Sequence, residues 1–261
     1  MNRYFIELSY NGSAFNGWQI QPNAPSVQEN IARNLSTLLK QKIIIFGAGR
    51  TDTGVHAKHF YAHFEIDKLI DTNQITYKLN KMLPRQIAIH SIFEVAHDMH
   101  ARFSALSRTY KYYITKYKDP FDYMYLCQIL PFPDLERMNK ACKYLSEYTD
   151  FTSFSKSRTG VRTNNCNITF AQWEKNDKQL VFTIKANRFL RNMVRAIVGT
   201  LISIGQGKME PEDIKKIIEE KDRGSAGVSV AGHALFLTDI EYPEGFDKYY
   251  ENKEKQTKQE L

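Results

Sequence analysis

The chain has 261 residues, of which 42% are hydrophobic, enough for one large folded domain or two small ones. Its formal net charge of +7 favours a polyanionic partner, although a basic balance also serves solubility. We expect neither a signal peptide nor a membrane span, because no apolar run has the length or the flanks of either. Cys127, Cys142 and Cys166 are odd in number and lack C-x-x-C spacing, which predicts reduced thiols in a cytoplasmic protein.

The apolar pattern of the first half predicts a β-α-β-β-α-β order, which is typical of a ferredoxin-like unit. Ser26 and Glu29 have the spacing of a capping box at the start of the first helix. In chain order we expect a strand over 4–10, a helix over 27–38, and strands over 43–46 and 60–66. A helix that carries Ile75, Leu79 and Met82 follows, capped by Asp71 or Thr72, and then a strand over 87–92.

The second half, from Ser107, has a similar order of elements without any repeat of residues. A polar turn at 175–178 predicts a hairpin between two of its strands. We expect a strand over 110–114, a loop over 120–133, a helix over 135–145, strands over 167–173 and 180–186, an amphipathic helix over 188–204, a short helix from 211 and a strand over 234–242.

The order of elements therefore predicts an α/β (α+β) protein built from two similar halves. We expect an N-terminal half over 1–105, a C-terminal half over 106–246 and a polar tail of mixed charge over 247–261. The composition of the tail is typical of a disordered terminus.

The stretch GAGRTDTGVHA, residues 47–57, places one carboxylate, Asp52, among three glycines between two β-like runs. A dinucleotide-binding loop is excluded, because Asp52 occupies the position of its third glycine and repels a pyrophosphate. A glycine-rich turn with a solvated Asp is the plain alternative. A catalytic Asp, held between strands and facing a substrate, is the other.

The same stretch resembles the signature of the tRNA pseudouridine synthase A family, whose usual form is GAGRTDAGVHA, so that Thr53 alone departs. One other segment departs: Val230, Ala231 and Ala234 stand where the family has Ala, Pro and Gly. Further matches cover nearly the whole chain except the tail, at 10–12, 15–19, 21, 26–28, 100–105, 108–112, 150–154 and 186–195.

The resemblance implies the pseudouridine synthase fold, in which two ferredoxin-like halves join through a mainly antiparallel sheet around a central basic cleft. It also implies an isomerase that converts uridine to pseudouridine in the anticodon stem-loop of tRNA, typically at positions 38, 39 and 40. The implied partners are tRNA and a second copy of the chain. No cofactor is expected, because the reaction is an isomerisation without redox change.

The resemblance assigns the chemistry to Asp52, as a nucleophile or as a base, with Arg195 as the cation that keeps it ionised and oriented. It makes Tyr110 a stacking partner of the target base whose hydroxyl moves the carbon 5 proton. Leu235 would cover the other face of the base, and Arg50 would hold the flipped nucleotide. Basic residues expected to contact phosphates are Arg102, Arg108, Lys185, Arg188 and Arg191.

Plainer roles compete for these side chains, since Tyr110 and Leu235 also suit a protein core and Arg195 a helix surface. His56, His59 and His63 are spaced for a helix but lie in a predicted strand without H-E-x-x-H, so we expect no metal site. A non-catalytic RNA-binding protein or tRNA-folding chaperone would not need Asp52, Arg195 and Tyr110 together. A hydrolase would need a second matched carboxylate.

Overall fold

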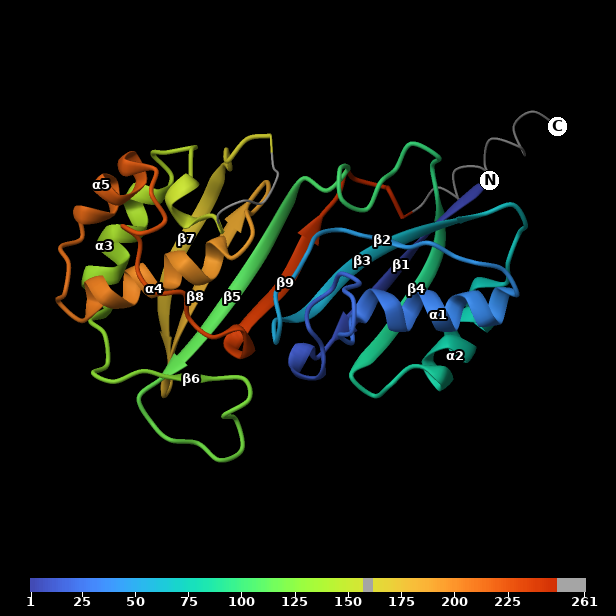
Figure 1. The fold of residues 1–261 in the computed structure, drawn as a ribbon, viewed down its shortest axis with the longest axis horizontal. Coiled ribbons are helices and arrows are strands. Elements are labelled where there is room, and N and C mark those ends of the chain that lie inside the picture. The colour runs from blue at the N-terminus through green and yellow to red at the C-terminus, as the bar shows by residue number, and fades with distance from the viewer. Residues whose placement is uncertain (157–161, 248–261) are drawn as a thin grey trace. The chain divides into compact units, whose positions relative to one another are not determined.

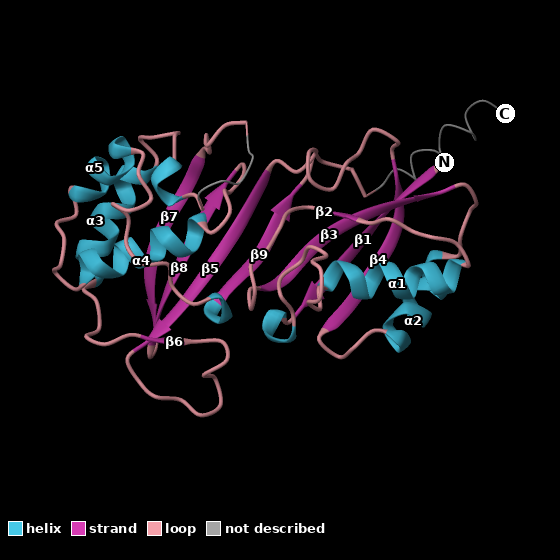
Figure 2. Ribbon diagram, in the orientation of Figure 1, coloured by secondary structure: helices cyan, strands magenta, loops and turns pink. Residues whose placement is uncertain are grey.

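The computed structural model describes residues 1–156 and 162–247, so the predicted tail lies, apart from Asp247, outside the described residues. The described ranges form nine strands, mostly antiparallel, and five α-helices (Figures 1 and 2). This confirms the predicted mixed α/β class. The chain divides into two compact units: unit 1 comprises Met1–Thr53, Ala57–Leu106 and the chain from Asp239 onward, and unit 2 comprises Gly54–His56 and Ser107–Thr238.

Unit 1 has the expected β-α-β-β-α-β order, and its helices lie on one face of its strands (Figure 2). Ser26 and Asp71 cap the two helices by accepting hydrogen bonds from the backbone N–H of Glu29 and Gln74, at 3.2 and 2.9 Å. β1 pairs antiparallel with both β3 and β4, and β2 pairs with β3. The elements are β1 (Asn2–Tyr10), α1 (Val27–Leu39), β2 (Phe46–Gly47), β3 (His56–Ile66), α2 (Thr72–Met82) and β4 (Ile87–Val95).

The predicted strand over 43–46 is wrong for all but its last residue, because β2 begins at Phe46. The alternation that suggested it is real, since Ile43 and Ile45 are buried and the residues between and after them are exposed. However, two side chains of α1 form hydrogen bonds with the backbone of this segment. Ile43 N–H donates to Ser36 Oγ at 2.9 Å, and Gln28 Nε2 donates to the Ile45 carbonyl at 2.8 Å. These bonds replace those of a neighbouring strand.

Unit 2 has the same β-α-β-β-α-β order of elements as unit 1, with two additions. These are the helix α5 and a short strand, β6, which pairs parallel with β5. β8 lies between β5 and β7 and pairs antiparallel with both, and the predicted hairpin turns at Asp177, whose φ is +48°. The elements are β5 (Ser107–Thr115), β6 (Cys127–Gln128), α3 (Leu135–Leu145), β7 (Ile168–Asn176), β8 (Gln179–Ala186), α4 (Met193–Gly205), α5 (Asp213–Glu220) and β9 (Leu235–Glu241).

Helix α4 is the centre of the unit 2 core and is buried on nearly every side, so the predicted amphipathic pattern, with one polar face, is wrong for this helix. Its predicted start at 188 is also wrong. Asn192 has φ +67°, a left-handed conformation that cannot continue a helix, so the helix begins at Met193. Gly199 lies where a Cβ atom would meet the Val228 carbonyl oxygen at 1.8 Å, which excludes every larger residue. No helix in the described ranges has the length and apolarity to cross a bilayer.

The face of the unit 1 strands opposite the helices is covered by aromatic rings rather than by helices. Phe5 and Tyr61 pack against Tyr242 and Phe246 from the last described segment of the chain. Beside them His63, 2% exposed, lies between Phe5 and Phe46, and its Nδ1 accepts the backbone N–H of Ala101 at 3.2 Å. Burial, and then the positive neighbours His100 and Arg3, lowers the pKa of His63 to about 4.

This buried imidazole predicts that the protein loses stability as the pH falls from about 6.5 towards 4. In that interval the unfolded chain takes up a proton at His63 that the native state excludes, so the equilibrium shifts towards unfolding. Burial also lowers the pKa of His56 and of His100, so His63→Gln should reduce the slope of stability against pH without abolishing it. Urea unfolding between pH 4 and pH 7 measures this slope.

The matched control for this measurement is His90→Gln, because His90 is an exposed histidine on β4 of the same unit. It should leave the slope as in the wild type. A slope that is the same in His63→Gln and in the wild type would contradict the assignment to the buried ring.

Candidate active site

Asp52 lies half-buried on the loop that leads from β2 to β3, at a point where the backbone is held from two sides. The Ala48 N–H donates to the Tyr61 carbonyl on β3 at 2.8 Å, and the Thr51 carbonyl accepts the N–H of Trp18 at 3.3 Å. Asp52 follows Thr51 directly, so the second bond fixes the backbone next to the carboxylate. Rigid support of this kind is what a reacting group on a loop needs.

The segment that holds the loop has its own steric requirements. Gly17 has φ +91°, and a Cβ atom there would lie 2.3 Å from the Thr51 carbonyl oxygen, so only glycine permits this approach. Trp18 is 2% exposed and packs on Phe60 with ring centroids 4.3 Å apart. The hydroxyls of Tyr10 and Thr51 share a buried hydrogen bond of 2.8 Å. This pairing of Tyr10 with Thr51 was not predicted from the sequence, although both residues lie in motifs matched to the family.

The predicted nucleotide-binding arginines of unit 1 are exposed. Arg50 lies two residues before Asp52 on the same loop, in reach of solvent. Arg102 is also exposed and places its guanidinium 5.5 Å from the centroid of the Phe103 ring. The predicted site residues of unit 1 are thus one half-buried carboxylate, Asp52, and two exposed cations, and exposed cations suit contact with a polyanion.

Tyr110 belongs to unit 2, where it lies on β5 opposite Ile184 of β8. Its ring meets the edge of Phe189, with centroids 5.2 Å apart and an interplanar angle of 88°. It is half-buried and packs against the core cluster of the unit without being part of it. This intermediate position is suited to a ring that supports a ligand.

Arg195 lies in the first turn of α4 and is held by the segment before β9. Its Nε donates to the Val230 carbonyl at 2.6 Å, and the Val230 N–H donates back to the Arg195 carbonyl at 3.2 Å. The next residue, Ala231, has φ −60° and ψ 148°, which suits the proline that the family has there. Ala234 lies in a short 3-10 turn and does not have positive φ, so it does not require glycine. The departures in this segment are therefore compatible with the local backbone.

The remaining predicted residues of unit 2 divide by burial. Leu235 is 4% exposed and belongs to the core cluster, so packing accounts for its position, and its role against a base stays a prediction. Arg108 is half-exposed and donates to the Asn187 carbonyl at 2.8 Å, which brings it next to the half-exposed Arg188. Lys185 is half-exposed on β8 and Arg191 is exposed.

The three histidines of the early strand each have a different partner and do not form a cluster. The ring of His56 bonds to the His233 carbonyl at 2.9 Å, and that of His59 bonds to Glu7 at 3.0 Å. His63 accepts from Ala101. Within the part of the chain that the structure describes, there is no group of three His, Cys, Asp or Glu side chains able to hold a metal ion.

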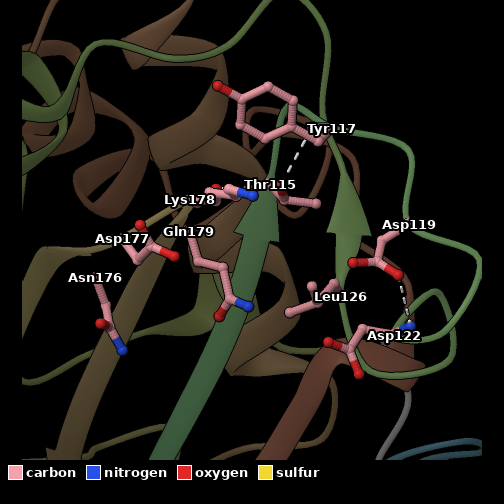
Figure 3. A pocket seen from close by; sticks show the side chains of 9 residues that line it. All are labelled: Thr115, Tyr117, Asp119, Asp122, Leu126, Asn176, Asp177, Lys178 and Gln179. Carbon is pink, nitrogen blue, oxygen red and sulfur yellow. Dashed lines mark hydrogen bonds between the residues drawn. The ribbon is translucent and has the colours of Figure 1, made fainter.

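A cavity of about 370 Å³ in unit 2 contains none of the predicted site residues (Figure 3). It lies between the end of β5, the β7–β8 turn and the loop after β5, where Asp119 accepts the N–H groups of Phe121 and Asp122. Asp119, Asp122 and Asp177 all line it, with Lys178 as the one cation among its lining residues. A wall with this charge disfavours a polyanion, so this cavity is not the candidate active site.

The hydroxyl pair beneath the Asp52 loop gives a test of how the loop is held. Tyr10→Phe or Thr51→Val should each destabilise the protein by about 1–3 kcal/mol, because each removes one partner of a buried hydrogen bond. The double variant should lose clearly less stability than the two single variants together, since the second change removes a group that has already lost this partner. Urea unfolding of the four proteins measures the coupling, and Tyr77→Phe, 65% exposed on α2, is the control. Additive losses would show that the two hydroxyls do not interact.

Comparison with known proteins identifies the family of the chain. The sequence model of a family described as tRNA pseudouridine synthase matches residues 8–104 and 141–243, which include Asp52 and Arg195. A tRNA pseudouridine synthase A from Bacteroides thetaiotaomicron is 52% identical over 247 residues, covering 94% of this chain and 92% of the relative. One from Parabacteroides distasonis is 53% identical over 245 residues, covering 94% and 97%. One from Streptococcus pneumoniae is 40% identical over 250 residues, covering 94% and 100%.

The family model and these relatives agree with the resemblance that the motifs show along the chain, and they match residues of both units. The chain therefore belongs to the tRNA pseudouridine synthase family.

Proposed function

We propose that the protein converts uridine to pseudouridine in tRNA, in the anticodon stem-loop, with Asp52 as the reacting carboxylate. The observation that carries this proposal is the Asp52 loop. Its backbone is fixed by the Thr51–Trp18 bond and by the contact with Gly17, and its sequence departs from the family signature only at Thr53. The family and the relatives named tRNA pseudouridine synthase A support the substrate. The net charge of +7 suits a polyanionic partner.

The proposed reaction exchanges one bond for another and loses no atom. The bond between N1 of the base and C1′ of the sugar breaks, and after the base turns, a bond between C5 and C1′ forms. C5 then loses its proton and N1 takes one up. Asp52 acts on the sugar as a nucleophile at C1′ or as a base at C2′, and in either role it must be ionised and oriented. Because the target base must leave the helical stack, its extrusion comes first, with Arg50 as the proposed group that holds the nucleotide.

Arg195 and Tyr110 complete the proposed machinery. The bond from Nε to Val230 fixes the plane of the guanidinium, and an oriented guanidinium can hold a carboxylate through two parallel hydrogen bonds. This is the role that we propose for it towards Asp52. Tyr110, supported at its edge by Phe189, is proposed to stack on the base and to receive the C5 proton at its hydroxyl.

The remaining parts of the proposal follow from the family rather than from particular contacts. Arg102, Arg108 and Arg188 are proposed to contact phosphates, which gives affinity without sequence choice. We further propose a homodimer in the cytoplasm that acts without metal or cofactor.

The central test of this function is Asp52→Asn. The change keeps the size of the side chain and removes its charge and nucleophilicity, so pseudouridine formation should be lost while the fold and most of the tRNA affinity remain. Nucleoside analysis of tRNA transcripts after incubation with purified protein measures the product, and a gel-shift assay measures binding. Asp98→Asn, an exposed carboxylate of the same unit, is the control and should retain full activity. Product from Asp52→Asn would contradict the assignment of the carboxylate.

A second test concerns the hydroxyl of Tyr110. Tyr110→Phe keeps the ring and removes only the group proposed to take the C5 proton, so the single-turnover rate should fall by about a hundredfold or more. RNA carrying 5-fluorouridine has no C5 proton to remove, so the variant should rearrange that base as fast as the wild type does. Tyr113→Phe, on the same strand with its ring against Phe236, is the matched control. An unchanged single-turnover rate on normal tRNA would leave Tyr110 as a stacking ring only.

A further inference from the structure

The turn that follows β4 exposes an aromatic ring that neither the fold nor the proposed chemistry uses. Phe103 is 75% exposed, among the most exposed large hydrophobic side chains of unit 1. The residue before it is the cation Arg102. One side of its ring rests on His100, with centroids 4.4 Å apart and an interplanar angle of 38°. His100 in turn lies 6.1 Å from Phe46, whose ring is 49% exposed. His100 is thus flanked by two exposed phenyl rings.

The exposure of Phe103 does not come from a loosely held loop, because the turn is closed by its own hydrogen bonds. The His100 N–H donates to Ser104 Oγ at 2.9 Å, and the Ser104 N–H donates to the His100 carbonyl at 2.9 Å. Nδ1 of His100 accepts the N–H groups of Arg102 and Phe103 at 3.0 and 3.3 Å. The N–H of Ala101 is bound to His63. Because these bonds hold the backbone that carries the ring, the backbone of the turn loses little entropy when a ligand covers the ring.

We propose that the exposed face of Phe103 is a stacking surface for a nucleobase of the bound RNA, with Arg102 as the cation beside it. The inference rests on the proposed function for the identity of the RNA, and it adds a binding residue that the chemistry of Asp52 does not require.

The charge around the ring favours a nucleotide over an apolar protein segment. Residues 99–106 contain no carboxylate, and the nearby Glu65 is already paired with Arg3, which also donates to the Met99 carbonyl at 2.8 Å. The Arg102 guanidinium lies 5.5 Å from the centroid of the Phe103 ring, so a base stacked on the ring would have its phosphate close to a cation. An aromatic ring next to a basic group is the usual means by which proteins hold unpaired nucleotides.

The test separates stacking from ionic contact through the salt dependence of tRNA binding. Affinity for an unmodified tRNA transcript is measured at several salt concentrations. Phe103→Ala and Phe103→Leu should weaken binding by about tenfold at every concentration, because base stacking is lost while no charge changes. Phe103→Trp should bind at least as tightly as the wild type. Arg102→Ala should instead flatten the slope of log affinity against log salt by roughly one phosphate contact.

Leu106→Ala is the matched control, because Leu106 is 57% exposed and lies three residues further along the same segment. It should leave both affinity and slope unchanged, and all variants should unfold at the wild-type urea concentration. Wild-type binding by Phe103→Ala would overturn the proposal. Full binding by Phe103→Leu would overturn it too, since the ring would then serve as an apolar contact for another partner.

Failure of this proposal can be distinguished from failure of the proposed function. A wild-type protein that binds the transcript but forms no pseudouridine contradicts the function, while the Phe103 series still decides the stacking site. Pseudouridine formation by the wild type, together with unchanged binding by Phe103→Ala, contradicts the stacking site alone. Absence of tRNA binding by the wild type contradicts both.

Discussion

The close approach of Gly17 and Trp18 to the Thr51 carbonyl is the contact on which the candidate active site depends. It brings the loop after β1 against the loop after β2, and it requires a residue without a Cβ atom at position 17. Asp52 is the next residue, so this contact fixes the backbone beside the residue that carries the carboxylate.

Unit 2 holds its proposed catalytic cation by the same means, with a backbone group from a neighbouring loop. The Val230 carbonyl fixes the Nε of Arg195, and Tyr112 anchors the same segment by donating from its hydroxyl to the Ala231 carbonyl at 3.1 Å. The backbone next to Asp52 and the guanidinium of Arg195 are thus both held by main-chain atoms, whose positions depend little on side-chain rotamers. Such preorganisation reduces the reorganisation needed when charge develops during a reaction.

The sequence predicted those features that depend on local physics. Helix starts at Ser26 and Asp134 follow from side chains that cap their own helices, and alternation along a strand needs only its neighbours. For the second helix the sequence offered Asp71 or Thr72 as the cap, and the structure has Asp71. The sequence failed where a distant partner decides. The bonds that keep Ile43–Ile45 out of β2 come from α1, and the left-handed turn at Asn192 leaves no periodic signal. The site residues came from the family signature, whereas the Tyr10–Thr51 hydroxyl pair required the structure.

The division of the chain between the units has a consequence for its biosynthesis. The chain passes from unit 1 to unit 2 and back, then into unit 2 again, and it returns to unit 1 only at Asp239. The segment that returns covers the aromatic face of unit 1, where Tyr242 bonds to the Ala101 carbonyl and Phe246 packs on Phe5. On the ribosome, the unit that starts first is therefore completed last. Its aromatic face stays uncovered until synthesis has passed Phe246, after all of unit 2 has been made.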